Sequence, residues 1–488
     1  MIEGGVGRAD APAVPEPARG RRRTKLVCTL GPASDDLVPE LVAAGMDVAR
    51  LNFSHGTPMT RSSSAEAVWA ARSAAGRAVA LLADLAGPKI RLGEIAEGEA
   101  TLEAGQPFVL HGRRDRGPGD FGRASVTYPR IAADVRPGDR ILLADGAAEL
   151  RVRAAADGVV ETEVVRGGTI RSRAGVSIPS ERLSSPALTA KDRADVPRAL
   201  ELQADYVAQS FVRRPDDVVT LRALLGPVPA PIIAKIETRA AIDGFDAILE
   251  VADAVMIARG DMGVELPYEE VPIIQKQLVR RALDRGIPTI VATQMLESMM
   301  ASPRPTRAEA SDVANAVFDG ADAIMLSGET AIGRYPVLAA EAAARIARLC
   351  EERGSAHLAA GAPPSAETDA GALAFAAVAL AGADADIAGI ACYSRTGRTA
   401  RMLSALRPSV PIFAFSPDPA VVARLALVHG VEPRSCVPPE GASSRLGLMA
   451  WLLAEAGAVP PGAPVVLVAS TAEPGTGPNA LEVHRIPG

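Results

Sequence analysis

Lys235 and Glu237 lie two residues apart at the end of a short apolar run, and their charged side chains could act together on one ligand. In a β-strand, residues two apart point to the same face, so both groups would meet at its carboxyl end. A second carboxylate, Asp261, follows the next apolar run and lies near two glycines, which let a backbone approach a ligand closely. Two carboxylates and one lysine indicate a divalent cation bound together with an anionic substrate.

The strands that must position these residues are visible as eight apolar runs, each followed by helical periodicity. Strand-then-helix alternation repeated eight times predicts a closed parallel (β/α)8 barrel of the TIM type, with right-handed crossovers between neighbouring strands. The predicted strands are residues 25–30, 48–52, 79–84, 206–210, 232–237, 254–258, 289–293 and 323–326.

Two further regions differ from the barrel in amino-acid composition and in the pattern of their apolar residues. The long gap between the third and fourth strands is rich in Gly, Pro and alternating apolar residues, which predicts a small β-barrel lid at the carboxyl-terminal mouth. After an expected linker at residues 353–371, apolar runs near 389–394, 411–415 and 464–469 predict an open α/β sheet. The predicted parts are a flexible leader at residues 1–23, the catalytic barrel at 24–86 and 187–350, the lid at 87–186 and a regulatory α/β domain at 366–488.

Composition excludes several classes of function. The 488-residue chain has a net charge of −6 and a sequence pI near 5.6, so no broad basic field is available for a nucleic acid. No apolar run reaches transmembrane length, and the first 23 residues lack the apolar segment of a signal peptide. The cysteines are widely spaced without metal-type pairing, which is typical of reduced thiols in a cytoplasmic protein: Cys28, Cys350, Cys392 and Cys436.

Polar residues follow most of the predicted strands and should converge on one rim, because the carboxyl ends of barrel strands share one mouth. These residues are Arg50, Asn52, Asp84, Lys235, Glu237, Arg259, Asp261, Thr293, Ser327 and Glu329.

The residue types at this rim indicate distinct tasks. Glu237 and Asp261 suit Mg²⁺ or Mn²⁺, which accepts one or two carboxylates and keeps positions for substrate oxygens and water. Arg50 can grip a phosphate through its planar fork of donors. The backbone N–H groups of Gly260 and Asp261 could bind a carboxylate if they open a helix, and Lys235 could stabilise an enolate or a transferring phosphoryl group.

Plainer interpretations exist for the same residues. Lys235 and Glu237 could form a buried ion pair that only closes the barrel, although polar groups at six strand ends favour an active site. His55 is more simply a helix-start residue than a metal ligand, and Trp69, Met295 and Met299 are more simply core.

Seven stretches resemble the pyruvate kinase family, and the resemblance runs from about residue 24 to the C-terminus and is weakest in the lid. They read TKLVCTLGPAS at 24–34, GMDVARLNFSHG at 45–56, IAKIE at 233–237, ARGDMGVE at 258–265, ATQMLESM at 292–299, PTRAE at 305–309 and MLSGET at 325–330.

The resemblance implies phosphoryl transfer from phosphoenolpyruvate to ADP, giving pyruvate and ATP, in a homotetramer assembled through the barrel and the third domain. It assigns the phosphoryl group to Arg50, the transition state to Lys235, Mg²⁺ to Glu237 and Asp261, the substrate carboxylate to Gly260 and Asp261, the protonation face to Thr293, proton delivery to Ser327 and Glu329, and nucleotide contacts to Asn52, Phe53, Ser54, His55 and Arg91.

One departure concerns the monovalent cation. By resemblance, Asn52, Ser54, Asp84 and the carbonyl of Leu85 form a K⁺ pocket, but Lys89 stands where K⁺-activated members have glutamate. An ammonium group there could supply the positive charge that K⁺ otherwise provides, which predicts activity without K⁺. The alternative is a surface lysine at the hinge of the lid.

Further departures fall in the lid and the third domain. Ala174 replaces a usual nucleotide-contacting lysine, for which Arg173 could substitute, and Asp145 is a weaker candidate for meeting the metal–nucleotide complex. The third domain offers a phosphate nest for a sugar-phosphate or nucleotide effector, or else ordinary helix capping by Ser394 or Thr399. The nest comprises Ser394, Thr396, Gly397, Arg398 and Thr399, whereas residues 472–479 depart from the family's usual effector loop.

Two rival functions remain at this stage. Metal-dependent aldolases of the pyruvate type also combine a barrel, a Glu/Asp metal pair and an arginine, but they need neither Thr293 nor an inserted lid. A metabolite-sensing barrel without catalysis would have lost rim residues such as Lys235 and Glu237, which are present.

Overall fold

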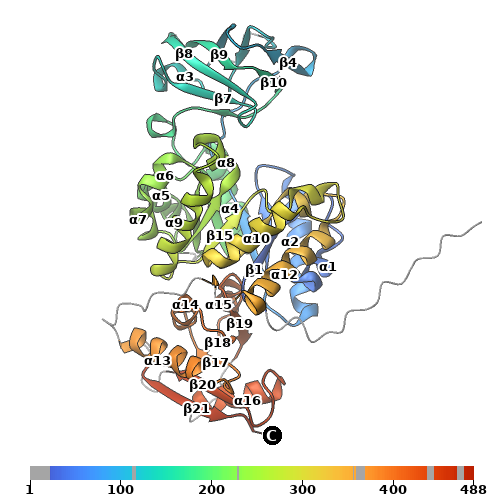
Figure 1. The fold of residues 1–488 in the computed structure, drawn as a ribbon, viewed down its shortest axis with the longest axis vertical. Helices are drawn as coiled ribbons and strands as arrows, with labels where there is room; N and C mark the ends of the chain where they lie inside the picture. Colours follow the sequence, from blue (N-terminus) through green and yellow to red (C-terminus); the bar gives the residue numbers. More distant parts are fainter. Residues whose placement is uncertain are drawn as a thin grey trace, which may run out of the picture.

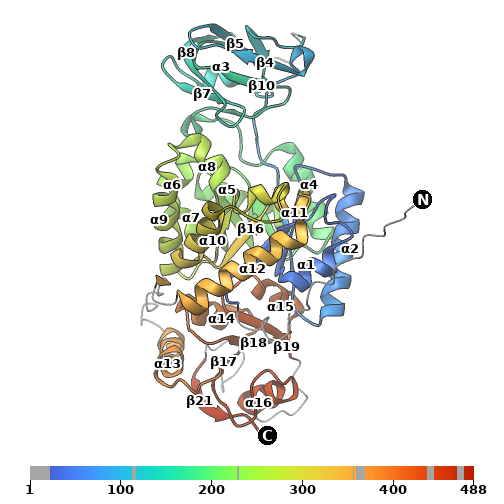
Figure 2. The ribbon, with the colours of Figure 1, turned by 45° about the vertical axis from the view of Figure 1, so that its right-hand side comes forward.

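Three units are stacked along the long axis of the molecule in the computed structural model (Figures 1 and 2). A β-rich unit lies at one end, the barrel in the middle and the C-terminal α/β unit at the other end. The structure describes residues 22–112, 117–227, 230–354, 357–358, 369–436, 445–469 and 478–487. The leader up to residue 21, most of the predicted linker and residues 472–477 of the late segment lie outside the described residues.

The barrel prediction is confirmed, because eight parallel strands close in the order β1-β16-β15-β14-β13-β12-β3-β2. Each strand begins and ends within one residue of its predicted position. The strands are β1 (Lys25–Thr29), β2 (Val48–Asn52), β3 (Ala80–Asp84), β12 (Tyr206–Gln209), β13 (Ile232–Ile236), β14 (Ala254–Ala258), β15 (Thr289–Ala292) and β16 (Ala323–Leu326).

Helices surround this barrel, and several begin at caps that the sequence encodes locally. Thr57, Thr189 and Thr306 each accept a backbone N–H from the third residue of the helix that follows, in a capping box. The helices are α1 (Val38–Ala44), α2 (Pro58–Ala75), α4 (Ala190–Glu201), α5 (Pro215–Leu225), α6 (Arg239–Asp243), α7 (Phe245–Leu249), α8 (Arg259–Glu265), α9 (Val271–Asp284), α10 (Arg307–Asp319), α11 (Gly328–Ala331) and α12 (Pro336–Arg353), with a 3₁₀ turn, η5 (Glu297–Met300).

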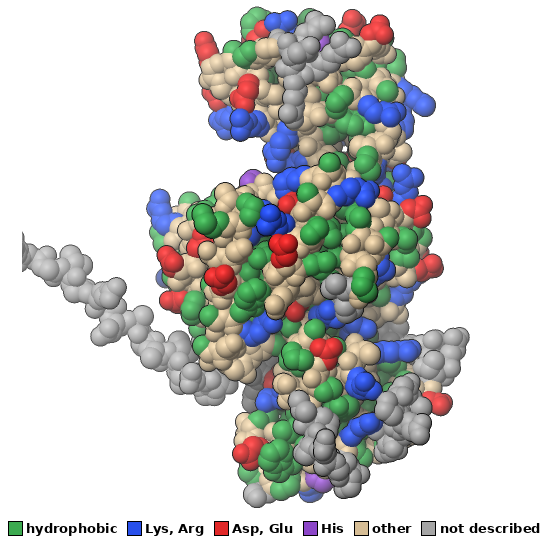
Figure 3. All heavy atoms as spheres, turned by 180° about the vertical axis from the view of Figure 1, so that it is seen from behind, with side chains coloured by type: hydrophobic (Ala, Val, Ile, Leu, Met, Phe, Trp, Pro, Cys, Tyr) green, Lys and Arg blue, Asp and Glu red, His purple; other side chains and the backbone are tan. Residues whose placement is uncertain are grey.

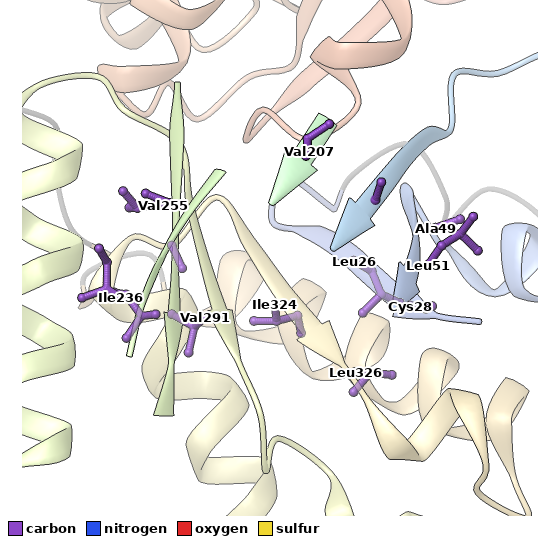
Figure 4. Packing of buried hydrophobic residues seen from close by; sticks show 14 of the residues in the cluster. Leu26, Cys28, Ala49, Leu51, Val207, Ile236, Val255, Val291, Ile324 and Leu326 are labelled. Atoms are coloured by element: carbon purple, nitrogen blue, oxygen red, sulfur yellow. The ribbon is translucent and has the colours of Figure 1, made fainter. Parts of the chain in front are cut away.

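Side chains alternate between two faces of the barrel strands. Residues such as Leu26, Cys28 and Ile324 point outward against the helices (Figure 4). Their neighbours Val27 and Met256 fill the interior, so the barrel is a packed core rather than a pore. Met295 and Met299 are buried, as predicted, and Trp69 packs against the same outer core. Because the strands are packed on both faces, their ends hold the polar residues of the rim in fixed positions.

The inserted lid follows β3, as predicted, and lies beyond one end of the barrel, next to α8 (Figures 1 and 2). Its described strands form a six-stranded sheet ordered β11-β7-β8-β9-β5-β6 and a two-stranded sheet, so the lid is a half-barrel. Its elements are η2 (Ala96–Gly98), β4 (Glu99–Leu102), β5 (Pro107–His111), β6 (Arg123–Ser125), α3 (Ile131–Asp134), β7 (Arg140–Leu143), β8 (Ala148–Ala156), β9 (Val159–Arg166), β10 (Gly168–Arg171), β11 (Val176–Ser177) and η4 (Ser180–Arg182).

The C-terminal unit is the predicted open sheet, ordered β19-β18-β17-β20-β21, with β21 antiparallel to β20. Strands β19 and β21 were not among the sequence predictions. The elements are α13 (Asp369–Ala383), β17 (Ile390–Tyr393), α14 (Arg398–Ala405), β18 (Ile412–Ser416), α15 (Pro419–Leu425), β19 (Val431–Ser435), α16 (Arg445–Glu455), β20 (Pro464–Ala469) and β21 (Ala480–Arg485).

The start of β1 joins the barrel to the C-terminal unit. The carbonyl of Arg23 accepts the N–H of Gly430 at 2.9 Å, and Lys25 Nζ donates to the carbonyl of Val431 at 2.7 Å. The N–H of Arg23 in turn donates to Glu351 of α12 at 2.7 Å. The last two residues of the predicted leader, 22 and 23, therefore belong to this junction.

Asp47 organises the charges at this junction, and its replacement by asparagine should destabilise the fold. Its carboxylate lies 2.7 Å from Arg22 and 3.2 Å from Arg77. Burial opposes ionisation, but Arg22, Lys25 and Arg77 outweigh it and lower the pKa of Asp47 to about 2. We expect Asp47→Asn to reduce the free energy of unfolding in urea by about 2 kcal/mol at pH 7.

Because the pKa of Asp47 is depressed in the folded state, its contribution is present above the unfolded pKa near 4 and is lost as pH falls through about 2. The loss should therefore be equal at pH 7 and pH 5. Glu163→Gln is the matched control, since Glu163 pairs with Arg153 at an exposed site and should cost less than about 1 kcal/mol. An Asp47→Asn loss no larger than that of the control would contradict this assignment.

All four cysteines are free, in line with the prediction of reduced thiols. Among the described helices, none combines the length and the apolar character that crossing a membrane requires.

Candidate active site

A cavity of about 60 Å³ separates the lid from the mouth of the barrel. Its walls include Glu237 and Asp261 from the barrel and Lys89, Asp145 and Gly175 from the lid side. In the space-filling view, blue lysine and arginine side chains gather where the lid meets the barrel (Figure 3). The cavity is therefore lined by charged groups from both units.

Lys235 lies at the centre of the rim and is held by three partners. Its Nζ is 2.9 Å from Glu237 Oε1 and 3.4 Å from Asp84 Oδ1, and it donates to Ser210 Oγ at 2.6 Å. Burial would lower the pKa of Lys235, but the two carboxylates outweigh it and raise that pKa. The side chain is therefore a fixed ammonium ion near the carboxyl end of β13.

Arg50 is positioned by the same carboxylate network. Its Nε donates to Asp84 Oδ2 at 2.7 Å, and its Nη1 donates to Thr29 Oγ1 at 2.9 Å. Burial opposes ionisation of Asp84, but Lys235 and Arg50 lower its pKa, so it stays a carboxylate. Asp84, predicted to be a K⁺ ligand, here neutralises two cations of the protein itself.

Glu237 and Asp261 are chemically suited to a divalent cation. Burial raises the pKa of Glu237, and the nearby charge of Asp261 raises it further, so this pair gains from a bound positive charge. Glu237 Oε2 accepts the N–H of Phe211 at 2.8 Å, while Oε1 is buried without an aligned hydrogen bond despite its closeness to Lys235. Among the described residues, no group of three or more His, Cys, Asp or Glu forms a metal cage. A two-carboxylate site fits Mg²⁺, which keeps water and substrate oxygens as its other ligands.

Thr293 sits in a strained turn at the end of β15. Its φ is +73° and that of Gln294 is +54°, which is costly for a β-branched residue and is often found at functional sites. Its hydroxyl oxygen accepts the N–H of Gly260 at 2.7 Å, and its carbonyl accepts Arg259 Nη2 at 2.8 Å. Gly260 and Asp261 lie in the first turn of α8, which is the condition set for binding a carboxylate, but the Gly260 N–H is bonded to Thr293 in this structure.

Ser327 and Glu329 follow β16. Glu329 is buried, and its two oxygens accept the N–H groups of Ser327 at 2.7 Å and Leu296 at 3.0 Å. The Ser327 hydroxyl is buried and has no hydrogen-bond partner among the described residues, which leaves it free for a substrate or a water.

Lys89, on the lid side, contacts Asp261, one of the two carboxylates suited to a divalent cation. Its Nζ lies 3.0 Å from Asp261 Oδ1, and both side chains are about one-third exposed. The alternative of a surface lysine at the hinge does not account for this ion pair, because Lys89 and Asp261 both line the cavity together with Glu237.

The lid residues predicted to meet the nucleotide are in different situations. Asp145 lines the cavity, in a turn with φ of +52°. Arg173 is exposed and pairs with Glu94 at 2.8 Å, and its carbonyl accepts Arg91 Nη1 at 3.1 Å. Ala174 packs against the core of the lid. Arg173 would have to leave Glu94 to replace the family lysine.

The turn after β2 carries the other predicted nucleotide residues. Asn52 Oδ1 accepts the N–H of Ser54 at 3.0 Å. The Phe53 ring is buried, and its carbonyl accepts Lys191 Nζ at 2.7 Å. His55 is exposed in the turn before α2, whose N-cap is Thr57 rather than His55. The carbonyl of Leu85, the last predicted K⁺ ligand, accepts Ser210 Oγ at 2.7 Å.

The predicted effector nest lies between β17 and α14. Gly397 is the N-cap of α14, with φ of +78° and no side-chain cap, so the capping alternative for Ser394 and Thr399 is not what the structure shows. Ser394 and Thr399 are buried, whereas Thr396 and Arg398 are exposed.

Three residues of this site were missed by sequence reasoning. Ser210 and Thr29 hold Lys235 and Arg50, and Lys191 holds the turn after β2. Ser210 ends a predicted strand, just as the recognised rim residues do, and that position was the available signal.

A closed parallel barrel with a lysine, an arginine and a carboxylate pair at its mouth defines an enzyme that acts on phosphorylated or carboxylate anions. Comparison with protein families narrows this class. The model "Pyruvate kinase, barrel domain" matches residues 21–340, and the model "Pyruvate kinase, alpha/beta domain" matches residues 371–484. The chain belongs to the pyruvate kinase family.

Individual relatives agree along nearly the whole chain. A pyruvate kinase of Mycobacterium tuberculosis is 44% identical over 474 residues, which covers 95% of this chain and 98% of the relative. One from Geobacillus stearothermophilus is 42% identical over 478 residues, covering 96% of this chain and 81% of the relative. A crystal structure of a pyruvate kinase from Cryptosporidium parvum superposes with a TM-score of 0.87 at 31% identity, covering 97% of this chain and 98% of that one. The chain is thus a phosphotransferase with pyruvate kinase activity in glycolysis, and the aldolase and sensing-barrel alternatives are set aside.

Proposed function

We propose that this enzyme transfers the phosphoryl group of phosphoenolpyruvate to ADP at the rim formed by Arg50 and Lys235. Two fixed cations beside one another suit a phosphoryl group whose negative charge is spread over several oxygens. Arg50 binds that group through the donors it does not spend on Asp84 and Thr29. The Lys235 ammonium stabilises the charge that passes from the phosphoryl group to the enolate oxygen.

Glu237 and Asp261 would hold Mg²⁺ or Mn²⁺ between them. When bound, such an ion neutralises charge on the phosphoryl and enolate oxygens. The unaligned Glu237 Oε1 and the raised pKa of this carboxyl support the proposal.

The remaining rim residues orient the substrate and deliver its proton. The N–H groups of Gly260 and Asp261 bind the substrate carboxylate, which requires the Thr293 hydroxyl to release Gly260. Thr293 then faces the carbon that accepts a proton. The unpartnered hydroxyl of Ser327, a residue whose backbone N–H is bonded to Glu329, continues the path for that proton.

We further propose that catalysis does not require K⁺, and one observation carries this proposal. The Lys89 ammonium lies 3.0 Å from Asp261, so a protein cation already occupies the neighbourhood of the metal carboxylates. The residues of the predicted K⁺ pocket are engaged with protein partners: Asn52 with Ser54, Asp84 with Arg50 and Lys235, and Leu85 with Ser210.

The nucleotide lies between the lid, residues 87–186, and the turn after β2 in this proposal. Asn52, Ser54, His55 and the backbone of Phe53 contact it from the barrel, and Arg91 contacts it from the lid. The shared cavity with Asp145 and Lys89 supports this placement.

The assembly proposed is a homotetramer formed through the barrel and the C-terminal unit. Large apolar side chains are exposed on both, which supports burial against other copies. They include Tyr268 and Ile273 on the barrel and Phe375 and Val483 on the C-terminal unit. A sugar-phosphate or nucleotide effector would bind at the nest of residues 394–399.

The test is the initial rate of pyruvate formation from phosphoenolpyruvate and ADP with Mg²⁺, in K⁺-free and K⁺-containing buffers of matched ionic strength. Equal rates are expected, together with loss of activity on chelation of divalent cations and recovery with Mg²⁺ or Mn²⁺. A rate seen only with K⁺ would remove Lys89 from its proposed role. No pyruvate in either buffer, even with candidate effectors, would overturn the assignment of the rim.

A further inference from the structure

Helix α8 contacts both chain segments that connect the lid to the barrel. Its first turn carries Asp261, which pairs with Lys89 on the segment that leaves the barrel. Its last residue, Glu265, bonds Ser180 on the segment that returns from the lid. In both ribbon views α8 lies directly below the lid (Figures 1 and 2).

Glu265 joins three elements through a single oxygen. Its Oε2 accepts the Ser180 hydroxyl at 2.6 Å and the backbone N–H of Arg239 at 2.9 Å. Ser180 opens η4 and is only 1% exposed, so this hydroxyl is shielded from water. Arg239 opens α6, two residues after the metal-type carboxylate Glu237.

This arrangement links the lid to both metal-type carboxylates. Glu237 follows β13 and Asp261 follows β14, and Glu265 connects the segments that come after them. Glu265 also lines the cavity that contains Lys89 and Asp145. A shift of the return segment relative to α8 would therefore change the separation between lid and carboxylates.

We propose that Glu265 is a positioning residue, which fixes the return segment of the lid to α8 through Ser180 and so sets the distance between the nucleotide contacts of the lid and Asp261. The inference rests on the proposed function, since it takes the lid to contact ADP. The plainer role for Glu265 is to cap α6 through Arg239 alone.

Ser180→Ala separates these two roles, because it removes the lid contact and leaves the bond to Arg239 intact. We expect the KM for ADP to rise roughly three- to tenfold, with kcat changed less than about twofold. The lid loses the charge-assisted hydrogen bond that fixes it to α8, so its nucleotide contacts are less well positioned before ADP binds. The KM for phosphoenolpyruvate should change less. Backbone hydrogen exchange over residues 176–183 should become faster in the variant.

Glu265→Gln and the double variant complete a mutant cycle. Glu265→Gln should raise the KM for ADP as well, and adding Ser180→Ala to it should have little further effect, because both changes weaken one contact. Glu270→Gln is the matched control, since Glu270 meets Arg239 only through an exposed pair at 3.9 Å and should leave every parameter unchanged.

A Ser180→Ala enzyme with wild-type KM for ADP and wild-type exchange would overturn the proposal, as would fully multiplicative effects in the double variant. If Glu265→Gln fails to fold, Ser180→Ala still decides. A wild-type enzyme without pyruvate formation would instead refute the proposed function, while faster exchange in Ser180→Ala would still report the lid contact.

Discussion

Replacing Lys235 by methionine should lower kcat for pyruvate formation by about 10³-fold or more, since a fixed charge at a phosphoryl-transfer centre is typically worth that much. Methionine retains the approximate length of the side chain but removes the ammonium that lies between Glu237 and Asp84. The proposed metal ligands, Glu237 and Asp261, are unchanged, so binding of Mn²⁺ should remain measurable. Steady-state kinetics and a Mn²⁺ titration check the two parts of this prediction.

Lys235→Arg is the control, because it keeps the positive charge but changes the shape of the cationic group. Its guanidinium is too broad for the three partners of Lys235, so activity should recover only in part. Circular dichroism must first show that Lys235→Met is folded, because removing one member of a buried pair can cost about 3 to 5 kcal/mol. Normal turnover in a folded Lys235→Met enzyme would remove this residue from the mechanism.

Lys89→Glu should make the enzyme depend on K⁺. The change removes a cation 3.0 Å from Asp261 and adds an anion beside it, so the K⁺-free rate should fall on the order of 100-fold. Added K⁺ should restore most of the rate, because it supplies the missing charge. Initial rates across a K⁺ titration at constant ionic strength measure this effect.

Arg171→Glu is the matched charge reversal, on an exposed strand of the lid where Arg171 pairs with Glu99. It should leave the response to K⁺ unchanged. A K⁺-free rate that survives in Lys89→Glu would show that Lys89 does not act as the internal cation.

The barrel was readable from sequence because each of its strands is a short apolar run with turn residues around it. Strands β19 and β21 were not predicted, because neither sequence contains a continuous apolar run. The segment Val431–Ser435 contains Pro433 and two charged residues, and Ala480–Arg485 is largely solvent-facing, so neither shows an apolar run. Pairing with an existing sheet, rather than intrinsic pattern, makes them strands.

The identity of the rim residues was also readable, but their partners were not. Parallel pairing of β12 with β3 sets Ala208 opposite Asp84, which brings Ser210 and Lys235 to the same carboxylate although Asp84 lies far away in the chain. Hydrogen bonds such as Ser180 to Glu265 depend in the same way on where the lid returns to the barrel. Spacing along the chain carries no signal for such contacts.

The pairing of β1 has a consequence for biosynthesis. One edge of β1 pairs with β2, but the other pairs with β16, beginning with Lys25 opposite Ala323, and the Lys25 ammonium ends on Val431. During translation, one edge of β1 therefore stays unpaired until nearly all of the barrel has been made. The hydrogen bond from Lys25 to the carbonyl of Val431 can form only later, when the C-terminal unit has been synthesised. Closure of the barrel pairs the first strand to be synthesised with the last one. A nascent chain stalled before residue 323 should therefore expose an unpaired edge of β1 that can associate with other strands. A chain released after the C-terminal unit has been made should not expose that edge.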